Sequence, residues 1–178
     1  MANVYIISDL HFGHKRITSF TDELGKKYRT GDDYLENMHH IISNWNSVVN
    51  KRDLVWVLGD VAFTQEGFDA LFELNGRIKM VRGNHDNYFK TEDWLKRVES
   101  VEGITQYKGH WLTHAPIHPD ELRGRPNLHG HVHHNSIRNK YTGGLDLRYK
   151  NMCCEAVNET PYPFDLIKSG KYDMERYL

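Results

Sequence analysis

The chain contains 178 residues, of which 39% are hydrophobic, and this length suits one domain with a full core better than two. We therefore expect residues 1–178 to form a single domain. Its 23 basic and 24 acidic residues create no net positive field, so there is no strong signal for nucleic-acid binding. The sequence shows neither a secretory leader nor an apolar run of about 18 residues, which predicts a cytoplasmic protein without a membrane span. The adjacent Cys153 and Cys154 are expected to be reduced thiols.

The first half of the chain predicts alternating strands and helices. Apolar runs indicate strands at 4–7, 54–58 and 77–81, and apolar residues at helical spacing indicate helices at 34–49 and around 68–74. This order is typical of parallel βαβ units, whose ligand sites lie beyond the carboxyl ends of the strands.

The second half has a different pattern. Short apolar runs are separated by Gly, Pro and Asn, and they favour a more antiparallel sheet. These runs lie at 104–107, 110–114, 127–131, 144–147 and 153–157.

Polar clusters follow the predicted strands. In "SDLHFGH", Asp9 and His11 follow the first strand with one residue between them, so in extended geometry both side chains would leave on the same side. The clusters together contain Asp9, His11, Asp60, Asn84, His85, His114, His131 and His133. Asp, Asn and His are ligands of divalent ions, and the lack of thiolate ligands argues against a structural zinc site. Seven candidate ligands exceed the need of one ion, so two ions fit better, with Asp60 able to bridge them.

Five short motifs occur in a recognisable order: "DLH", "GD", "GNHD", "TH" and "GHVH". In this order and spacing they resemble the calcineurin-like metallophosphoesterase superfamily, especially its small phage and bacterial members. The resemblance implies an α/β (α+β) fold, a four-layer sandwich of two facing mixed β-sheets flanked by helices. It also implies that one metal is held by Asp9, His11, Asp60 and His133, and the other by Asp60, Asn84, His114 and His131.

The implied chemistry is hydrolysis of a phosphoester at two divalent metal ions. Mn²⁺ is the expected ion, with Fe, Zn, Ni or Mg as alternatives. We expect a water or hydroxide between the metals to be the nucleophile. By resemblance, His85 stays off the metals and acts as the general acid on the departing oxygen, with Asp86 or a nearby backbone group orienting its ring.

The substrate is less well defined by the sequence. The "GD" motif continues as "GDVAFT", which places Phe63 where the protein phosphatase branch has a second Asp and omits the Arg that follows. We favour a phosphodiester, with nucleotides and cyclic nucleotides among the candidates, and keep a phosphomonoesterase as the alternative. A non-catalytic scaffold of the same fold is disfavoured because every ligand position holds a matching residue type.

Several residues keep two interpretations. Asp60 alone suits a turn or helix cap, and "GNHD" alone suits a simple turn. The segment 15–33 is either a substrate lid or a solvated loop, as is the segment 117–127 with Arg123 and Arg125. The basic residues of the first of these are Lys15, Arg16, Lys26, Lys27 and Arg29. For the remaining histidines, His14 either contacts substrate or faces solvent, His129 and His134 flank the ligands, and His110 and His118 are expected at the surface.

Overall fold

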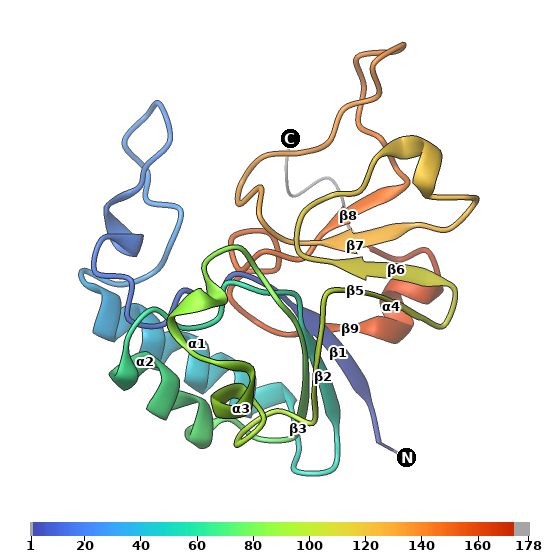
Figure 1. The fold of residues 1–178 in the computed structure, drawn as a ribbon. Helices are drawn as coiled ribbons and strands as arrows, with labels where there is room; N and C mark the ends of the chain where they lie inside the picture. Colours follow the sequence, from blue (N-terminus) through green and yellow to red (C-terminus); the bar gives the residue numbers. More distant parts are fainter. Residues whose placement is uncertain (1, 173–178) are drawn as a thin grey trace.

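Two β-sheets form the centre of the protein, as Figure 1 shows. The computed structural model describes residues 2–172. The first sheet has five strands in the order β4-β3-β2-β1-β9, and the second has four in the order β5-β6-β7-β8. The strands are β1 Val4–Ile7, β2 Leu54–Val57, β3 Arg77–Val81, β4 Ser100–Glu102, β5 Ile104–Tyr107, β6 His110–Thr113, β7 Asn127–His129, β8 Tyr149–Asn151 and β9 Tyr162–Pro163.

Helices α1, α2 and α3 lie on one side of the first sheet, and the second sheet lies on the other side (Figure 1). Helix α4 packs near β1, and the ring of its Phe164 lies 5.2 Å from that of Tyr107 in β5. The predicted fold of two mixed sheets flanked by helices is therefore confirmed. The helices are α1 Tyr34–Val48, α2 Gln65–Ala70, α3 Thr91–Trp94 and α4 Phe164–Lys168, with short 3₁₀ helices at Ile17–Ser19, Leu71–Glu73, Asp86–Tyr88 and Pro119–Glu121.

Strands β1, β2, β3 and β4 are parallel, which confirms the predicted βαβ arrangement. Helix α1 begins where the Asp33 side chain accepts hydrogen bonds from two backbone amides of the first turn, and its apolar face, including Ile41 and Trp45, is buried in the core. Because the strands run in one direction, their carboxyl ends meet at one edge of the sheet.

The second sheet differs from the prediction of a more antiparallel sheet. Only the β5–β6 pair is antiparallel, whereas β6–β7 and β7–β8 are parallel. The predicted strands at 144–147 and 153–157 are wrong: Leu145 and Cys153 make only isolated bridges, and the real strand β8 lies between these segments. A three-residue strand is too short for alternation of polar and apolar residues to reveal it.

A parallel bridge between Ser8 and Cys153 joins the carboxyl end of β1 to the segment that follows β8. The two sheets therefore meet at the end of β1, where the polar clusters lie. Both cysteines are buried and free, as expected. Among the helices of residues 2–172, none is both long and apolar enough to span a bilayer.

Candidate metal centre

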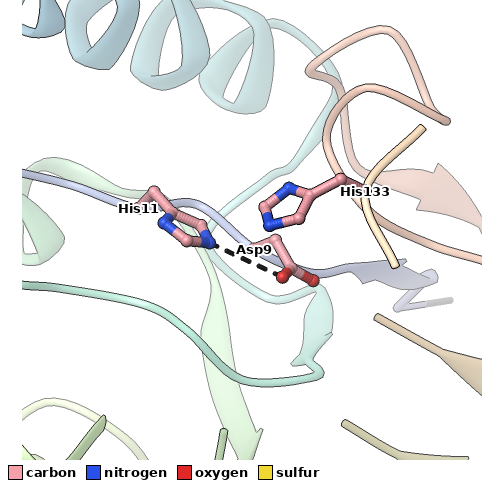
Figure 2. Close-up of side chains that lie close together, drawn as sticks. All are labelled: Asp9, His11 and His133. Atoms are coloured by element: carbon pink, nitrogen blue, oxygen red, sulfur yellow. Dashed lines mark ion pairs between the residues drawn. The ribbon is translucent and has the colours of Figure 1, made fainter. Parts of the chain in front are cut away.

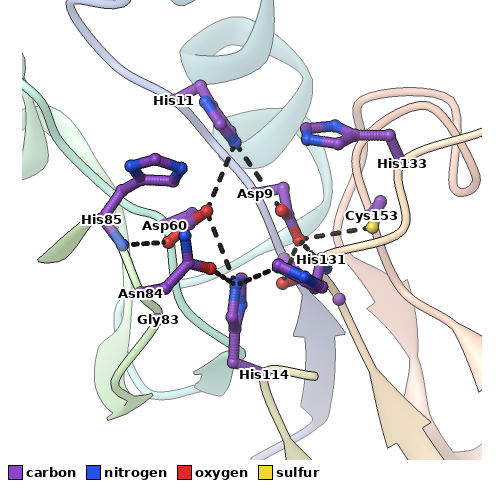
Figure 3. A network of polar contacts seen from close by, with 12 residues as sticks. Asp9, His11, Asp60, Gly83, Asn84, His85, His114, His131, His133 and Cys153 are labelled. Atoms are coloured by element: carbon purple, nitrogen blue, oxygen red, sulfur yellow. Dashed lines mark hydrogen bonds and ion pairs between the residues drawn. The ribbon is translucent and has the colours of Figure 1, made fainter. Parts of the chain in front are cut away.

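All seven candidate ligands lie together where the strands of both sheets end (Figure 3). Asp9 and His11 follow β1, Asp60 follows β2, Asn84 follows β3, His114 follows β6, and His131 and His133 follow β7. The first sheet therefore supplies four of these side chains and the second sheet supplies three.

The backbone at these positions is not extended. Five of the candidate ligands have positive φ angles, in the left-handed region that non-glycine residues rarely adopt: Asp9 (58°), His11 (54°), Asp60 (52°), His131 (72°) and His133 (52°). The extended backbone expected at Asp9 and His11 is therefore wrong, although both side chains still lie together in one group of ligands. Such conformations cost about 1–3 kcal/mol each and concentrate at functional sites. Two of them are held by backbone hydrogen bonds of 3.0 Å, in which the amide of Asp9 donates to the carbonyl oxygen of Gly59 and the amide of His11 donates to that of Asp60.

Asp9, His11 and His133 form the first group of ligands (Figure 2). One ligand atom from each lies within 4.8 Å of the others, and His11 Nε2 is 3.6 Å from Asp9 Oδ1. Asp9 Oδ1 and both ring nitrogens of His11 are buried and have no hydrogen-bond partner within the described part of the chain. Buried polar atoms are almost always satisfied, and converging oxygen and imidazole nitrogen atoms are satisfied by a divalent cation. These residues therefore fit an ion.

Asp60, His114 and His131 form the second group, again with one ligand atom each within 4.8 Å of the others. Asn84 Oδ1 lies 2.8 Å from His114 Nε2, so the amide oxygen joins this group. His114 Nδ1 lies 2.8 Å from the carbonyl oxygen of Leu58 and donates to it when it carries the proton. That contact orients the ring so that Nε2 faces the cluster.

Ionised carboxylates and a cationic imidazole balance one another in the cluster. Burial opposes ionisation of Asp9, but the contact with His11, whose Nε2 lies 3.6 Å from Asp9 Oδ1, outweighs it and holds the pKa of Asp9 well below its usual value. The pKa of Asp60 is also lowered, because His114 outweighs the same effect of burial. Burial lowers the pKa of His114, but the hydrogen bond to Asp60 outweighs it and raises this pKa to about 9. Below that pH, and with no ion bound, both ring nitrogens of His114 carry a proton and the ring is cationic.

We expect metal binding to release protons at neutral pH. Because the pKa of His114 is about 9 without an ion, Nε2 must lose its proton before it can coordinate a cation. Metal affinity should therefore rise as the pH increases from 6.5 towards 9. Calorimetric titrations with Mn²⁺ in two buffers of different ionisation enthalpy measure the proton release, and identical heats in both buffers would contradict it.

Asp9 is held by neighbours that the sequence did not reveal. Its Oδ2 accepts hydrogen bonds from Ser8 Oγ, from the backbone amide of His131 at 3.0 Å and from Cys153 Sγ at 3.3 Å. Burial and the adjacent Asp9 raise the pKa of Cys153 well above its usual value, so the thiol stays protonated and can donate. With Oδ2 engaged, Oδ1 is the oxygen that faces His11.

Glu155 and Arg29 lie behind the first group of ligands. The sequence alone did not identify Glu155, and it placed Arg29 only among the basic residues of the 15–33 loop. Glu155 Oε1 lies 3.1 Å from His133 Nδ1 and accepts a hydrogen bond of 2.8 Å from Arg29 Nε. The Arg29 side chain is 0% exposed and also donates to the carbonyl oxygen of Asp9. Arg29 is thus not a solvent-facing residue of the 15–33 loop. Burial opposes ionisation of Glu155, but the charge of Arg29 outweighs it and lowers the pKa of Glu155 to about 2.

Replacing Glu155 with glutamine should weaken ion binding at the first group by about 10–100-fold, because the contact with Glu155 fixes the orientation of the His133 ring. The melting temperature should also fall, since Arg29 would keep its buried charge and lose its anionic partner. Competition against a Mn²⁺ chelator measures the affinity. The control Asp32→Asn removes a carboxylate that is 95% exposed and should change neither quantity. Wild-type affinity in Glu155→Gln would show that His133 needs no such support.

His85 and Asp86 have different surroundings from those expected. The backbone amide of His85 donates to Asp60 Oδ1 at 2.9 Å, while its exposed ring lies 5.2 Å from that of Phe63. The carboxylate of Asp86 accepts hydrogen bonds from the backbone amides of Asp60, Val61 and Gly83. Asp86 therefore ties the "GD" and "GNHD" loops together and does not orient the ring of His85.

Two glycines allow these loops to approach closely. A Cβ atom at Gly83 would collide with Asp60, and one at Gly130 would collide with Ser8 and Asp9. This explains physically why glycine precedes the ligands in "GNHD" and "GHVH".

A cavity of about 650 Å³ opens beside the candidate metal centre, and the candidate ligands that line it are His11, His131 and His133. His14 and the 15–33 loop form one wall, and the segment after β7 forms another. The exposed Arg123 and Arg125 of the 117–127 loop are not among the described lining residues. His14 therefore faces the cavity rather than bulk solvent alone. Of the other histidines, His129 is buried beside the ligands, His134 is exposed at the rim and stacks on Tyr28, His110 is half-buried against Phe164, and His118 is exposed.

Comparison with known protein families matches residues 2–152 to the calcineurin-like phosphoesterases, and the chain belongs to this family. It is 29% identical over 174 residues to an uncharacterised protein of Methanocaldococcus jannaschii, covering 94% of this chain and 90% of the relative. It is 30% identical over 199 residues to the gene 66 protein of Mycobacterium phage D29, covering 89% of this chain and 96% of the relative. A solved structure from Aquifex aeolicus, a protein of unknown function, shares the fold with a TM-score of 0.69 and 23% identity, over 95% of this chain and 99% of the other.

Family membership and the two ligand groups together support a metal-dependent phosphoesterase, a hydrolase with a phosphoester substrate. The resemblance to this family noted in the sequence is confirmed.

Proposed function

We propose that the chain is a phosphodiesterase with two divalent ions, and that Mn²⁺ is the ion it uses. The position of Asp60 carries the proposal. Its Oδ2 lies 3.8 Å from His11 Nε2 of the first group and 3.5 Å from His114 Nε2 of the second. One carboxylate oxygen therefore faces ligands of both groups, as a bridging ligand must. Oxygen and imidazole ligands without thiolates suit Mn²⁺, while Fe, Zn, Ni and Mg are the alternatives.

The chain offers a complete ligand set for both ions. The first ion would be held by Asp9, His11, Asp60 and His133, and the second by Asp60, Asn84, His114 and His131. Bound divalent ions supply positive charge that orients the phosphate and stabilises the charge that develops during its displacement. Asn84 contributes a neutral oxygen, so two carboxylates partly neutralise the ions and the site keeps its attraction for a phosphate.

We assign His85 the role of general acid. Its ring is exposed to the cavity, whereas its backbone is fixed by the hydrogen bond from its amide to Asp60. The imidazole thus borders the space that the phosphate would occupy and can donate a proton to the departing oxygen.

The charges around the cavity favour a phosphodiester. A monoester dianion carries an additional charged oxygen that needs a further cation, but no Lys or Arg is among the described residues that line the cavity. Lys15 and Arg16 are exposed outside the lining, and Arg29 is engaged with Glu155. A diester carries one negative charge fewer, so the two ions supply more of the stabilisation it requires.

The test compares bis(p-nitrophenyl) phosphate with p-nitrophenyl phosphate, using the manganese-loaded protein at one pH. We expect kcat/KM to be higher for the diester. A monoester value about tenfold above the diester value, or about 1.4 kcal/mol of transition-state preference, would replace the proposal with a phosphomonoesterase. Binding of Mn²⁺ without turnover of either ester would instead indicate a non-catalytic scaffold.

A further inference from the structure

We propose that the wall of the cavity formed by Phe20 and the stacked pair of Tyr28 and His134 is a subsite for a planar aromatic ring carried by the phosphoester, such as the base of a nucleotide. This inference rests on the proposed function, because it names the class of substrate that the same site selects. The wall lies outside the candidate ligand groups and comes from two segments distant in the sequence, the 15–33 loop and the segment after β7.

Aromatic rings dominate this wall. The rings of Tyr28 and His134 are stacked, with centroids 3.9 Å apart and planes 6° apart. The Phe20 ring lies near-parallel to that of His14, with centroids 6.2 Å apart, and both residues line the cavity. Phe20 is 47% exposed, so it serves as a surface of the cavity and contributes little to the core.

The wall has a fixed backbone. The amide of Tyr28 donates to the carbonyl oxygen of Phe20 at 3.1 Å, and an antiparallel bridge joins Thr21 to Lys27. Beyond Tyr28, the buried Arg29 binds Glu155 and the carbonyl oxygen of Asp9. The 15–33 loop, blue in Figure 1, is therefore folded back on itself and anchored by Arg29 to Glu155 and to the carbonyl oxygen of Asp9.

The chemistry of the wall selects a planar apolar group. Phe20, Tyr28 and the apolar Ile17 line the cavity together, and no Lys or Arg accompanies them among the described lining residues. A second phosphate would find no Lys or Arg among the described residues that line this cavity, whereas an aromatic ring would find rings to stack on. Lys26 and Lys27 line a separate cavity that shares Tyr28 and His134. A volume of about 650 Å³ also lies within the range of sites that enclose small ligands.

Calorimetry on the manganese-loaded protein can compare adenosine 5′-monophosphate with ribose 5-phosphate, which carries the same phosphate and sugar but no base. We expect the nucleotide to bind at least about fivefold more tightly, because stacking of one base contributes about 1 kcal/mol or more. In Phe20→Leu, the ratio of the two dissociation constants should fall to less than about threefold. The control Tyr141→Ala removes an aromatic ring that is 84% exposed and not among the lining residues, and it should keep the wild-type ratio.

Equal dissociation constants for the two ligands in the wild-type protein would overturn the subsite, as would a ratio that Phe20→Leu leaves unchanged. The diester assay separates this failure from failure of the proposed function. A protein that hydrolyses bis(p-nitrophenyl) phosphate but binds both ligands equally is a phosphodiesterase without an aromatic subsite. A protein that binds the nucleotide preferentially but hydrolyses no ester keeps the subsite and loses the proposed reaction.

Discussion

Replacing Asp60 with alanine should remove nearly all phosphoesterase activity and lower the metal content, while the fold persists. Asp60 Oδ2 faces His11 in one ligand group and His114 in the other, so its loss affects both proposed ion positions. The fold should persist because the carboxylate serves to neutralise cations and fills little of the apolar core. Equilibrium dialysis against Mn²⁺ measures the number of ions bound, and far-ultraviolet circular dichroism monitors the fold.

The matched control for this variant is Asp32→Ala, which removes a carboxylate that is 95% exposed. It should retain wild-type metal content and turnover. If Asp60→Ala binds Mn²⁺ with the wild-type stoichiometry, Asp60 does not bridge two ions. If the variant instead unfolds, Asp60→Asn provides the test, because it keeps the shape of the side chain and removes its charge.

Replacing His85 with asparagine should separate catalysis from metal binding. We expect the variant to keep its metal content but to lose about 10²–10⁴-fold in rate on a dinucleoside monophosphate, whose alkoxide leaving group needs a proton. The contact between His85 and Asp60 uses the backbone amide, which asparagine retains. The loop that carries Asn84 should therefore stay in place.

The leaving group provides the internal control for His85. Nitrophenolate departs without protonation, so the loss of rate should be much smaller with bis(p-nitrophenyl) phosphate. An equal loss on both substrates, with the metal content unchanged, would show that His85 positions the phosphate and does not act as an acid.

The sequence predicted three of the five strands of the first sheet, β1, β2 and β3, because each is an apolar-rich run that ends in a polar cluster, but it did not predict the short strands β4 and β9. Strands β1 and β3 have the expected bounds, and β2 ends one residue earlier than expected. Parallel strands align their carboxyl ends, so ligands separated widely along the chain were expected at one edge. The convergence of Asp9, Asp60 and Asn84 follows from this geometry.

The left-handed backbone of the candidate ligands could not be predicted, because the local sequence gives Asp9 and His11 no reason to leave the extended conformation. The cause lies in the tertiary structure, because the carbonyl oxygens of Gly59 and Asp60, in a neighbouring loop, accept hydrogen bonds from the backbone amides of Asp9 and His11. Short-range periodicity also cannot detect the ion pair between Arg29 and Glu155, whose residues are 126 positions apart. Sequence alone therefore placed Arg29 in a solvated or lid-forming loop, whereas folding buries it behind Asp9 and Glu155.

Stepwise reconstitution with Mn²⁺ tests the central claim, that two ions held by these residues are required for phosphoester hydrolysis. Protein freed of metal by a chelator should hydrolyse no bis(p-nitrophenyl) phosphate, because the described cavity lining offers no Lys or Arg to replace the ions. Added Mn²⁺ should restore turnover, with activity reaching its maximum when about two ions are bound per chain. Full turnover by exhaustively demetallated protein would contradict this account.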